Sequence, residues 1–147
     1  MSNPADNLAV SLFSEILAVD QLARAAAAGV LPKGMELSHF SVLNHLAHIG
    51  AERTPAQMAR TFHLTRGAMT NTLGKLEWAG WVHIRPDWDD ARRKLVLISP
   101  SGLAARNAAL QAITPLIADI VGKLGLDRVR AVLPVLRDMR VLLAEDQ

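Results

Sequence analysis

The chain has 147 residues, of which 50% are hydrophobic and 20% are charged, and its formal net charge is +2. A chain of this size and composition can bury a sizeable core, so we expect one compact domain rather than a disordered segment. It contains no cysteine, which excludes disulfides, a thiolate nucleophile and a zinc site built from cysteines.

The first residues, MSNPADN, lack the basic and apolar regions of a secretory signal. No uninterrupted apolar run reaches the length of about 18 residues that a membrane span needs. We therefore expect a cytoplasmic protein without a membrane partner.

Positive charge is concentrated in one part of the chain. Residues 53–94 contain eight Lys or Arg and four Asp or Glu, which gives this segment a net charge of +4 and leaves −2 for the rest. Such clustering is expected for a protein that binds a polyanion, although a solvated surface gives the same count.

The first two predicted helices span residues 6–28 and 38–49. Apolar residues recur at helical spacing in the first, and Gly29, Pro32 and Gly34 follow its end. Ser38 is the expected N-cap of the second helix, and Gly50 is expected to end it.

A pair of shorter helices follows, at residues 55–61 and 66–79. Thr54, Pro55 and Gln57 form a capping-box pattern before the first, and Thr65 is a cap for the second. Two short helices joined by a few residues predict a helix-turn-helix.

The second of these helices has two different faces. If Met69, Leu73 and Leu76 point inward, the outer face carries small and polar residues and is suited to close approach by another surface. A DNA major groove accommodates such a helix, while a plain solvent-exposed face is the alternative interpretation. The outer residues are Gly67, Thr70, Asn71 and Gly74, flanked by Arg66 and Lys75.

Two β-rich runs, residues 81–85 and 94–99, enclose the charged stretch RPDWDDARRK and predict a hairpin with a long tip. Arg92, Arg93 and Lys94 at this tip can reach an adjacent DNA minor groove. Asp89 or Asp90 is expected to hold the guanidinium of Arg92, while a merely solubilising turn is the alternative. Trp88 is expected either to pack on the hairpin stem or to touch DNA.

The last predicted helices span residues 103–124 and 127–145, with Asp127 as the cap of the second. Pro115 and Pro134 either kink these helices or mark their true starts. The first and last helices are apolar on more than one side, so we expect residues 6–34 and 103–147 to form a dimerisation region beside a core at 38–99.

The order of these elements, and above all the segment DDARRKLVLISPSG, resembles the MarR family of winged helix-turn-helix transcriptional regulators along nearly the whole chain. The resemblance implies a mainly α fold of the α+β type, acting as a single 1–147 unit. It also implies a homodimer that binds a pseudo-palindromic operator in double-stranded DNA, with Arg92 as the wing arginine and Asp90 as the acid that orients it.

Where many members of the family have Ser or Thr at position 67 and Arg at 71, this chain has Gly and Asn, so its operator sequence stays open. The resemblance further suggests a repressor released by a phenolic or amphipathic small-molecule effector. The candidate DNA-contacting residues are Thr54, Gln57, Thr65, Arg66, Gly67, Thr70, Asn71, Lys75, Asp90, Arg92 and Arg93.

Three other kinds of protein are alternatives to a DNA-binding regulator. An enzyme is not expected, because the chain has no phosphate-binding glycine loop, HExxH motif or Ser/His/Asp spacing. A winged-helix dimer that binds proteins instead of DNA stays open. So does a metal-responsive regulator using His39, His45 and His48, although we expect these to be packing or surface residues and expect neither a metal nor a cofactor.

Overall fold

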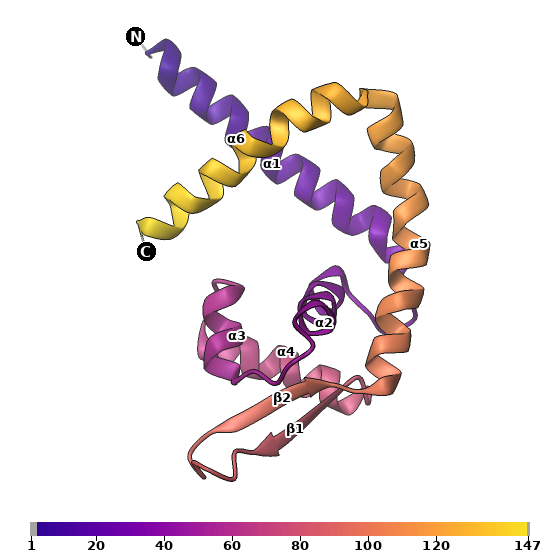
Figure 1. Cartoon of the computed structure of the whole chain (residues 1–147). Coiled ribbons are helices and arrows are strands. Elements are labelled where there is room, and N and C mark those ends of the chain that lie inside the picture. The colour runs from indigo at the N-terminus through magenta and orange to yellow at the C-terminus, as the bar shows by residue number, and fades with distance from the viewer. Residues whose placement is uncertain (1–2, 147) are drawn as a thin grey trace. The chain divides into compact units, whose positions relative to one another are not determined.

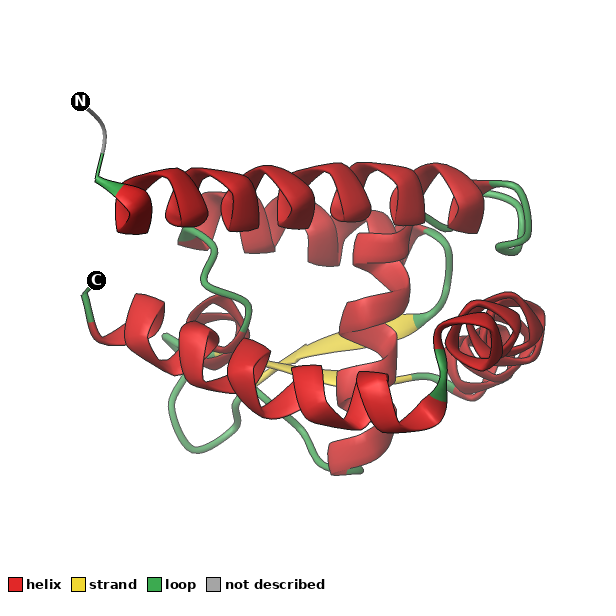
Figure 2. Ribbon diagram, turned by 90° about the horizontal axis from the view of Figure 1, so that it is seen from above, coloured by secondary structure: helices red, strands yellow, loops and turns green. Residues whose placement is uncertain are grey.

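The computed structural model describes residues 3–146, so Met1, Ser2 and Gln147, which close the ends of the expected 1–147 unit, lie outside the described residues. The elements follow the predicted order (Figure 1). They are α1 (Pro4–Ala28), α2 (Leu37–Ile49), α3 (Pro55–Thr61), α4 (Arg66–Trp78), β1 (Val82–Pro86), β2 (Lys94–Ile98), α5 (Pro100–Leu124) and α6 (Leu126–Glu145). Figure 2 shows how far helices predominate over the one short pair of strands.

The chain forms two compact units, residues 1–110 and 111–147, and the boundary lies inside α5. The first unit contains the winged helix-turn-helix. Its core is made by apolar side chains from α2, α3, α4, the two strands and the start of α5. Met69, Leu73 and Leu76 of α4 are buried as predicted, so the inward face of this helix is fixed.

Two predicted helix caps are wrong. Ser38 lies inside α2, which begins one residue earlier after Glu36, and the backbone N–H of Glu36 donates to Nδ1 of His39 at 3.1 Å. A histidine at the third helical position therefore has the role that Glu or Gln has in a capping box. The last helix begins after Gly125, so Asp127 lies within its first turn, where a carboxylate favours the helix dipole.

The remaining differences are small shifts of element ends. The first helix starts at Pro4 rather than at residue 6, because Asn3 caps it by accepting from the Ala5 N–H at 3.1 Å. Pro115 and Pro134 both lie inside their helices, so neither marks a helix start.

The hairpin is antiparallel, with Val82 opposite Ile98 and Pro86 opposite Lys94. Arg53, just before α3, adds a short bridge to its far side, since Arg53 and Val96 exchange backbone hydrogen bonds of 3.0 and 2.7 Å. The hairpin is thus joined directly to the segment that starts the helix-turn-helix.

The turn from β2 into α5 depends on Ser99 and Gly102. The Ser99 hydroxyl donates to the Gly80 carbonyl at 2.6 Å and accepts from the Gly102 N–H at 2.9 Å. A Cβ at position 102 would lie 1.9 Å from the Trp81 carbonyl oxygen, so only glycine fits against the residue that precedes β1. These contacts explain the serine and the glycine of the Ser-Pro-x-Gly pattern.

Large apolar side chains are exposed on the terminal helices, each considered by itself. On α1 they include Leu8, Val10, Leu17, Val19 and Leu22. On α6 the exposed set is Leu126, Val132, Leu133, Val135, Leu136, Val141, Leu142 and Leu143.

Candidate nucleic-acid interface

The outer face of α4 is open, as the sequence predicted. Arg66, Gly67, Thr70, Asn71 and Lys75 are all exposed on it. No atom lies within 4 Å of where a Cβ would stand at Gly67 or Gly74. The helix therefore presents a surface without large side chains at these two positions, and another molecule can approach its backbone closely.

A groove of about 860 Å³ separates α3 and α4 from the hairpin, and we call it the wing groove. It brings together Thr54, Gln57, Arg66, Thr70, Arg92 and Arg93 from the predicted set, together with Pro55, Ala56, Arg60, Leu73, Gly74, Glu77, Ile84, Arg85, Pro86 and Lys94. Six of these sixteen lining residues are Arg or Lys and one is acidic, so the groove is suited to an anionic ligand.

The tip of the hairpin has a defined conformation. Oδ1 of Asp90 accepts from the backbone N–H of Arg92 at 3.1 Å and from its Nε at 3.2 Å. Of the two acids considered for this role, Asp90 is the one that binds Arg92. The Arg92 side chain is 91% exposed, so its outer guanidinium nitrogens face solvent while its base is held.

Asp87 organises the other half of the tip. Its Oδ1 accepts from the Asp89 N–H at 3.0 Å, and its Oδ2 lies 3.8 Å from Nε of Arg93. The backbone of Asp87 also donates to the Arg93 carbonyl at 3.0 Å. Two acids of the charged stretch thus hold two arginines, which explains why they occur in a basic turn.

A second ionic contact ties the hairpin to the segment between α2 and α3. Nε and Nη2 of Arg85 donate to the two carboxylate oxygens of Glu52 at 2.9 and 2.6 Å. The same guanidinium lies 4.1 Å from the centre of the Trp88 ring. Of the two predicted positions for Trp88, packing on the stem is therefore present, and the ring is still 81% exposed.

Three predicted site residues also serve as helix caps. Thr54 Oγ1 accepts from the Gln57 N–H at 3.1 Å, and Gln57 Oε1 accepts from the Thr54 N–H at 2.9 Å. Thr65 Oγ1 accepts from the Ala68 N–H at 3.1 Å. Thr54 is buried, so its contribution is to set the start of α3, whereas Gln57 and Thr65 are exposed.

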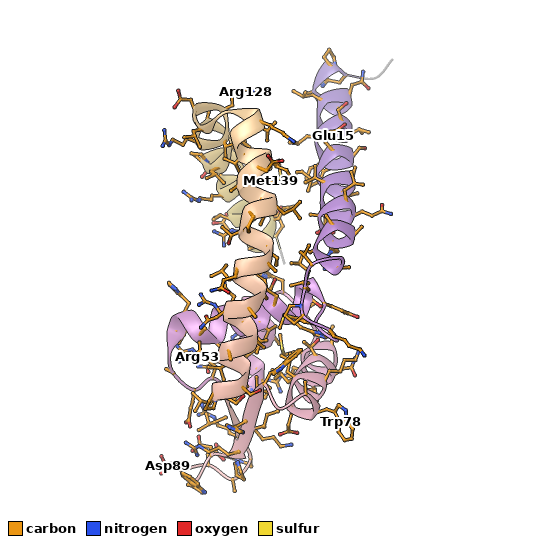
Figure 3. All side chains as sticks on the ribbon, turned by 90° about the vertical axis from the view of Figure 1, so that its right-hand side faces the viewer. Glu15, Arg53, Trp78, Asp89, Arg128 and Met139 are labelled. Carbon is orange, nitrogen blue, oxygen red and sulfur yellow. The ribbon has the colours of Figure 1, made fainter. Side chains whose placement is uncertain are left out.

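Asn71 and Lys75 do not line the wing groove. They line a second cleft of about 860 Å³ on the other side of α4, against the segment before α2, with Lys33, Trp78 and Trp81. Trp78 is 93% exposed and points away from the end of α4 (Figure 3). Asp89 is labelled at the hairpin tip in the same view. The predicted contacts are thus spread over both sides of one helix.

Sequence reasoning missed three residues of the site: Arg60, Arg85 and Glu52. The first two were visible only as part of the basic cluster, since nothing local to α3 or to the first strand tells which of their side chains face the groove. Glu52 lies 33 residues from Arg85, and no signal in a single sequence pairs them.

The histidines have structural contacts. His39 belongs to the start of α2, and the ring of His45 meets Phe62 edge-on at 5.3 Å. Burial lowers the pKa of His45 from 6.5, and the nearby charges of Arg53 and His48 lower it further. Within residues 3–146, no three His, Cys, Asp or Glu side chains gather as a metal site. No single helix in the same range has the length and apolar composition of a membrane span.

Comparison with known proteins finds a family match over part of the chain. Residues 33–93, which contain α2, the helix-turn-helix and most of the hairpin, match the model described as the MarR family. The matched segment, 61 of the 147 residues, is similar to the MarR family. No curated protein matches it by sequence.

Several solved structures share its fold. A mutant of MarR from E. coli, complexed with operator DNA, is 24% identical, covers 94% of this chain and 99% of its own, and gives a TM-score of 0.80. The regulator BldR from Sulfolobus solfataricus is 20% identical over 98% and 99%, with a TM-score of 0.78. The organohalide-sensing regulator RdhR-CbdbA1625, in its 2,4-dichlorophenol-bound form, is 17% identical over 98% and 87%, with a TM-score of 0.85. The mainly α, winged helix-turn-helix prediction is confirmed.

Proposed function

We propose that this chain is a homodimeric transcriptional regulator of the MarR family that binds a specific site in double-stranded DNA. The observation that carries the proposal is the pairing of an open polar helix face on α4 with the basic wing groove beside it. Helix-turn-helix proteins place the second helix in the major groove, and a basic hairpin next to it reaches the adjacent backbone or minor groove.

The residues divide into two roles. Gly67, Thr70, Asn71 and Lys75 are exposed on α4 and stand where base edges would lie, with Asn suited to adenine. Arg66, Arg92 and Arg93 supply positive charge for phosphates. Asp90 acts through Arg92, while Thr54, Gln57 and Thr65 fix the helix starts, the latter two with exposed side chains free to add contacts.

The comparison with MarR from E. coli supports this proposal, since that protein was crystallised with operator DNA and its structure covers almost the same length of chain. The unpaired apolar residues on α1 and α6 support a homodimer in which residues 6–34 and 103–147 form the interface. Two-fold symmetry would present two α4 helices about 34 Å apart to a pseudo-palindromic operator.

We further propose that the protein is a repressor whose DNA binding is relieved by a phenolic or similarly amphipathic molecule. The support is that a structural neighbour of this fold was solved with 2,4-dichlorophenol bound. A thermal-shift screen of phenolic acids and chlorophenols would identify a ligand as one that raises the melting temperature of the dimer and lowers its affinity for DNA.

The DNA proposal is tested by selection from a library of randomised duplexes at physiological salt, followed by fluorescence anisotropy on the enriched sequence. Enrichment of a pseudo-palindromic sequence, bound at nanomolar concentration in the presence of unrelated duplex, is the expected result. A library that stays random after selection would favour a winged-helix dimer that binds another protein.

A further inference from the structure

The wing carries an exposed tryptophan on an ionic support. The Trp88 ring stacks on the Arg85 guanidinium at 4.1 Å, and Arg85 is itself held by both carboxylate oxygens of Glu52. Arg85 also donates from Nη1 to the Pro86 carbonyl at 3.0 Å. The guanidinium is therefore fixed from three sides, and it covers one face of the indole.

Arg85 lines the wing groove, but its contacts differ from those of the other groove arginines. All three of its guanidinium nitrogens donate to protein acceptors, whereas Arg92 is bound to Asp90 through Nε alone and its side chain is 91% exposed. An arginine whose nitrogens are all engaged in the free protein is poorly suited to hold a phosphate, because those bonds would have to break first. Its geometry suits the positioning of Trp88 instead.

The face of the Trp88 ring that points away from Arg85 is exposed, and no contact within the described residues explains this exposure. The side chain is 81% exposed, although an indole is amphipathic and normally buries most of its area. In the sequence it lies between Arg85 and the Asp90–Arg92 pair, and Arg85, on which it stacks, lines the wing groove. Arg85 thus links the indole to a groove whose lining is mainly basic and suits a phosphate backbone.

We propose that Trp88 is a DNA-contacting residue of the wing, and that Glu52 and Arg85 are positioning residues that hold its ring. The inference rests on the proposed function. The indole packs against the deoxyribose edge of the duplex, and its Nε1–H is available to donate to a phosphate oxygen. Because the ring is fixed before binding, little side-chain entropy is lost when the contact forms.

The contact can be observed directly in protein labelled with 5-fluorotryptophan. The chain has three tryptophans, so three ¹⁹F resonances are expected, and Trp78→Phe and Trp88→Phe assign two of them. With the selected duplex at saturation, the Trp88 resonance should shift and lose much of its H₂O/D₂O isotope shift. The partly buried Trp81 serves as the internal reference. A Trp88 resonance that stays solvent-exposed while anisotropy reports saturation would overturn the contact and leave the proposed function standing.

Affinity measurements distinguish the loss of the Trp88 contact with DNA from the loss of a charge. Trp88→Ala should weaken binding roughly fivefold or more without changing the dependence on salt, because no charge is removed. Trp88→Phe should keep most of the affinity. Equal affinity of wild type and Trp88→Ala would contradict the contact, and failure of every duplex to bind specifically would overturn it together with the proposed function.

The positioning role is tested by the neutral pair Glu52→Gln with Arg85→Gln, which leaves the net charge unchanged. The pair should weaken DNA binding about as much as Trp88→Ala, and it should have little further effect in a Trp88→Ala background. An equal loss in both backgrounds would show that Glu52 and Arg85 do not act through Trp88. Thermal melting of each variant verifies that the comparison is made between folded proteins.

Discussion

Asp90 accepts two hydrogen bonds from Arg92, one from the backbone N–H at 3.1 Å and one from Nε at 3.2 Å. The first fixes the turn and the second fixes the first part of the guanidinium, so one carboxylate sets both the path of the chain and the direction of the side chain. This places an exposed arginine in a defined pose before any ligand arrives, which lowers the entropy lost on binding.

Asp90→Ala should therefore weaken DNA binding, by roughly threefold to tenfold. The direction is informative, because removing a negative charge from a surface that meets phosphates would strengthen binding if electrostatics alone decided it. Asp89→Ala removes the same charge one residue away and leaves both Asp90–Arg92 hydrogen bonds in place. Tighter binding by both variants, measured by anisotropy on the selected duplex, would contradict the orienting role.

Gly67 and Gly74 on α4 should show opposite effects on stability and on binding. Since a Cβ at either position would meet no atom within 4 Å, alanine there should raise the free energy of unfolding by up to about 1 kcal/mol each. The same methyl groups should weaken DNA binding, because they stand on the face proposed to enter the major groove. Urea unfolding and anisotropy measure the two effects, and unchanged or tighter DNA binding by both variants would place the duplex on another face.

Gly102→Ala should destabilise the first unit by about 1–3 kcal/mol in urea unfolding, because the new Cβ would lie 1.9 Å from the Trp81 carbonyl oxygen and the backbone must shift. Gly122→Ala is the matched control. It lies in the same helix with no atom within 4 Å of the new Cβ, and it should be neutral or stabilising. Equal stability of the two variants would mean that the turn relaxes without cost.

His45 should make stability depend on pH. Burial first, and then Arg53 and His48, hold the pKa of His45 below 6.5 in the folded protein. Below about pH 6.5 the unfolded imidazole is protonated while the folded one is still neutral, so the unfolded state binds more protons and stability falls as the pH falls. Above that pH both forms are neutral and the contribution vanishes.

His45→Gln should accordingly lose less stability than wild type between about pH 7.5 and pH 5.5 in urea unfolding. His83→Gln, at an exposed position on β1, controls for the loss of an imidazole. Parallel pH profiles for wild type and His45→Gln would show that other groups cause the acid sensitivity.

Most of the fold could be predicted because its signals are local. The cap Thr54 with Pro55 and Gln57, the glycines that follow α2 and α4, and the alternation in β2 each act within a few residues. The failures were also local: at Glu36, a histidine three residues on took the place of the usual Glu or Gln of a capping box. At Gly125, α6 begins with Leu126, one residue before Asp127, which was the predicted cap.

The candidate site was predictable in part for a different reason. The outer face of α4 and the Asp90–Arg92 pair follow from helical geometry and short spacing. The contribution of Arg60 to the wing groove, and the pairing of Glu52 with Arg85, depend on how the segment before α3 approaches the hairpin. That approach is set by the backbone bridge between Arg53 and Val96, which no periodicity in the sequence indicates.

The central claim is that α4 and the wing meet DNA, and the salt dependence of affinity tests it most directly. The selected duplex should be titrated with three proteins over a range of salt concentrations: wild type, Arg92→Ala and Arg130→Ala. Arg130 lies in α6, outside the winged segment. We expect Arg92→Ala to weaken binding and to reduce the slope of log K against log salt by about 1, while Arg130→Ala behaves as wild type. Identical slopes and affinities for all three proteins would contradict the account.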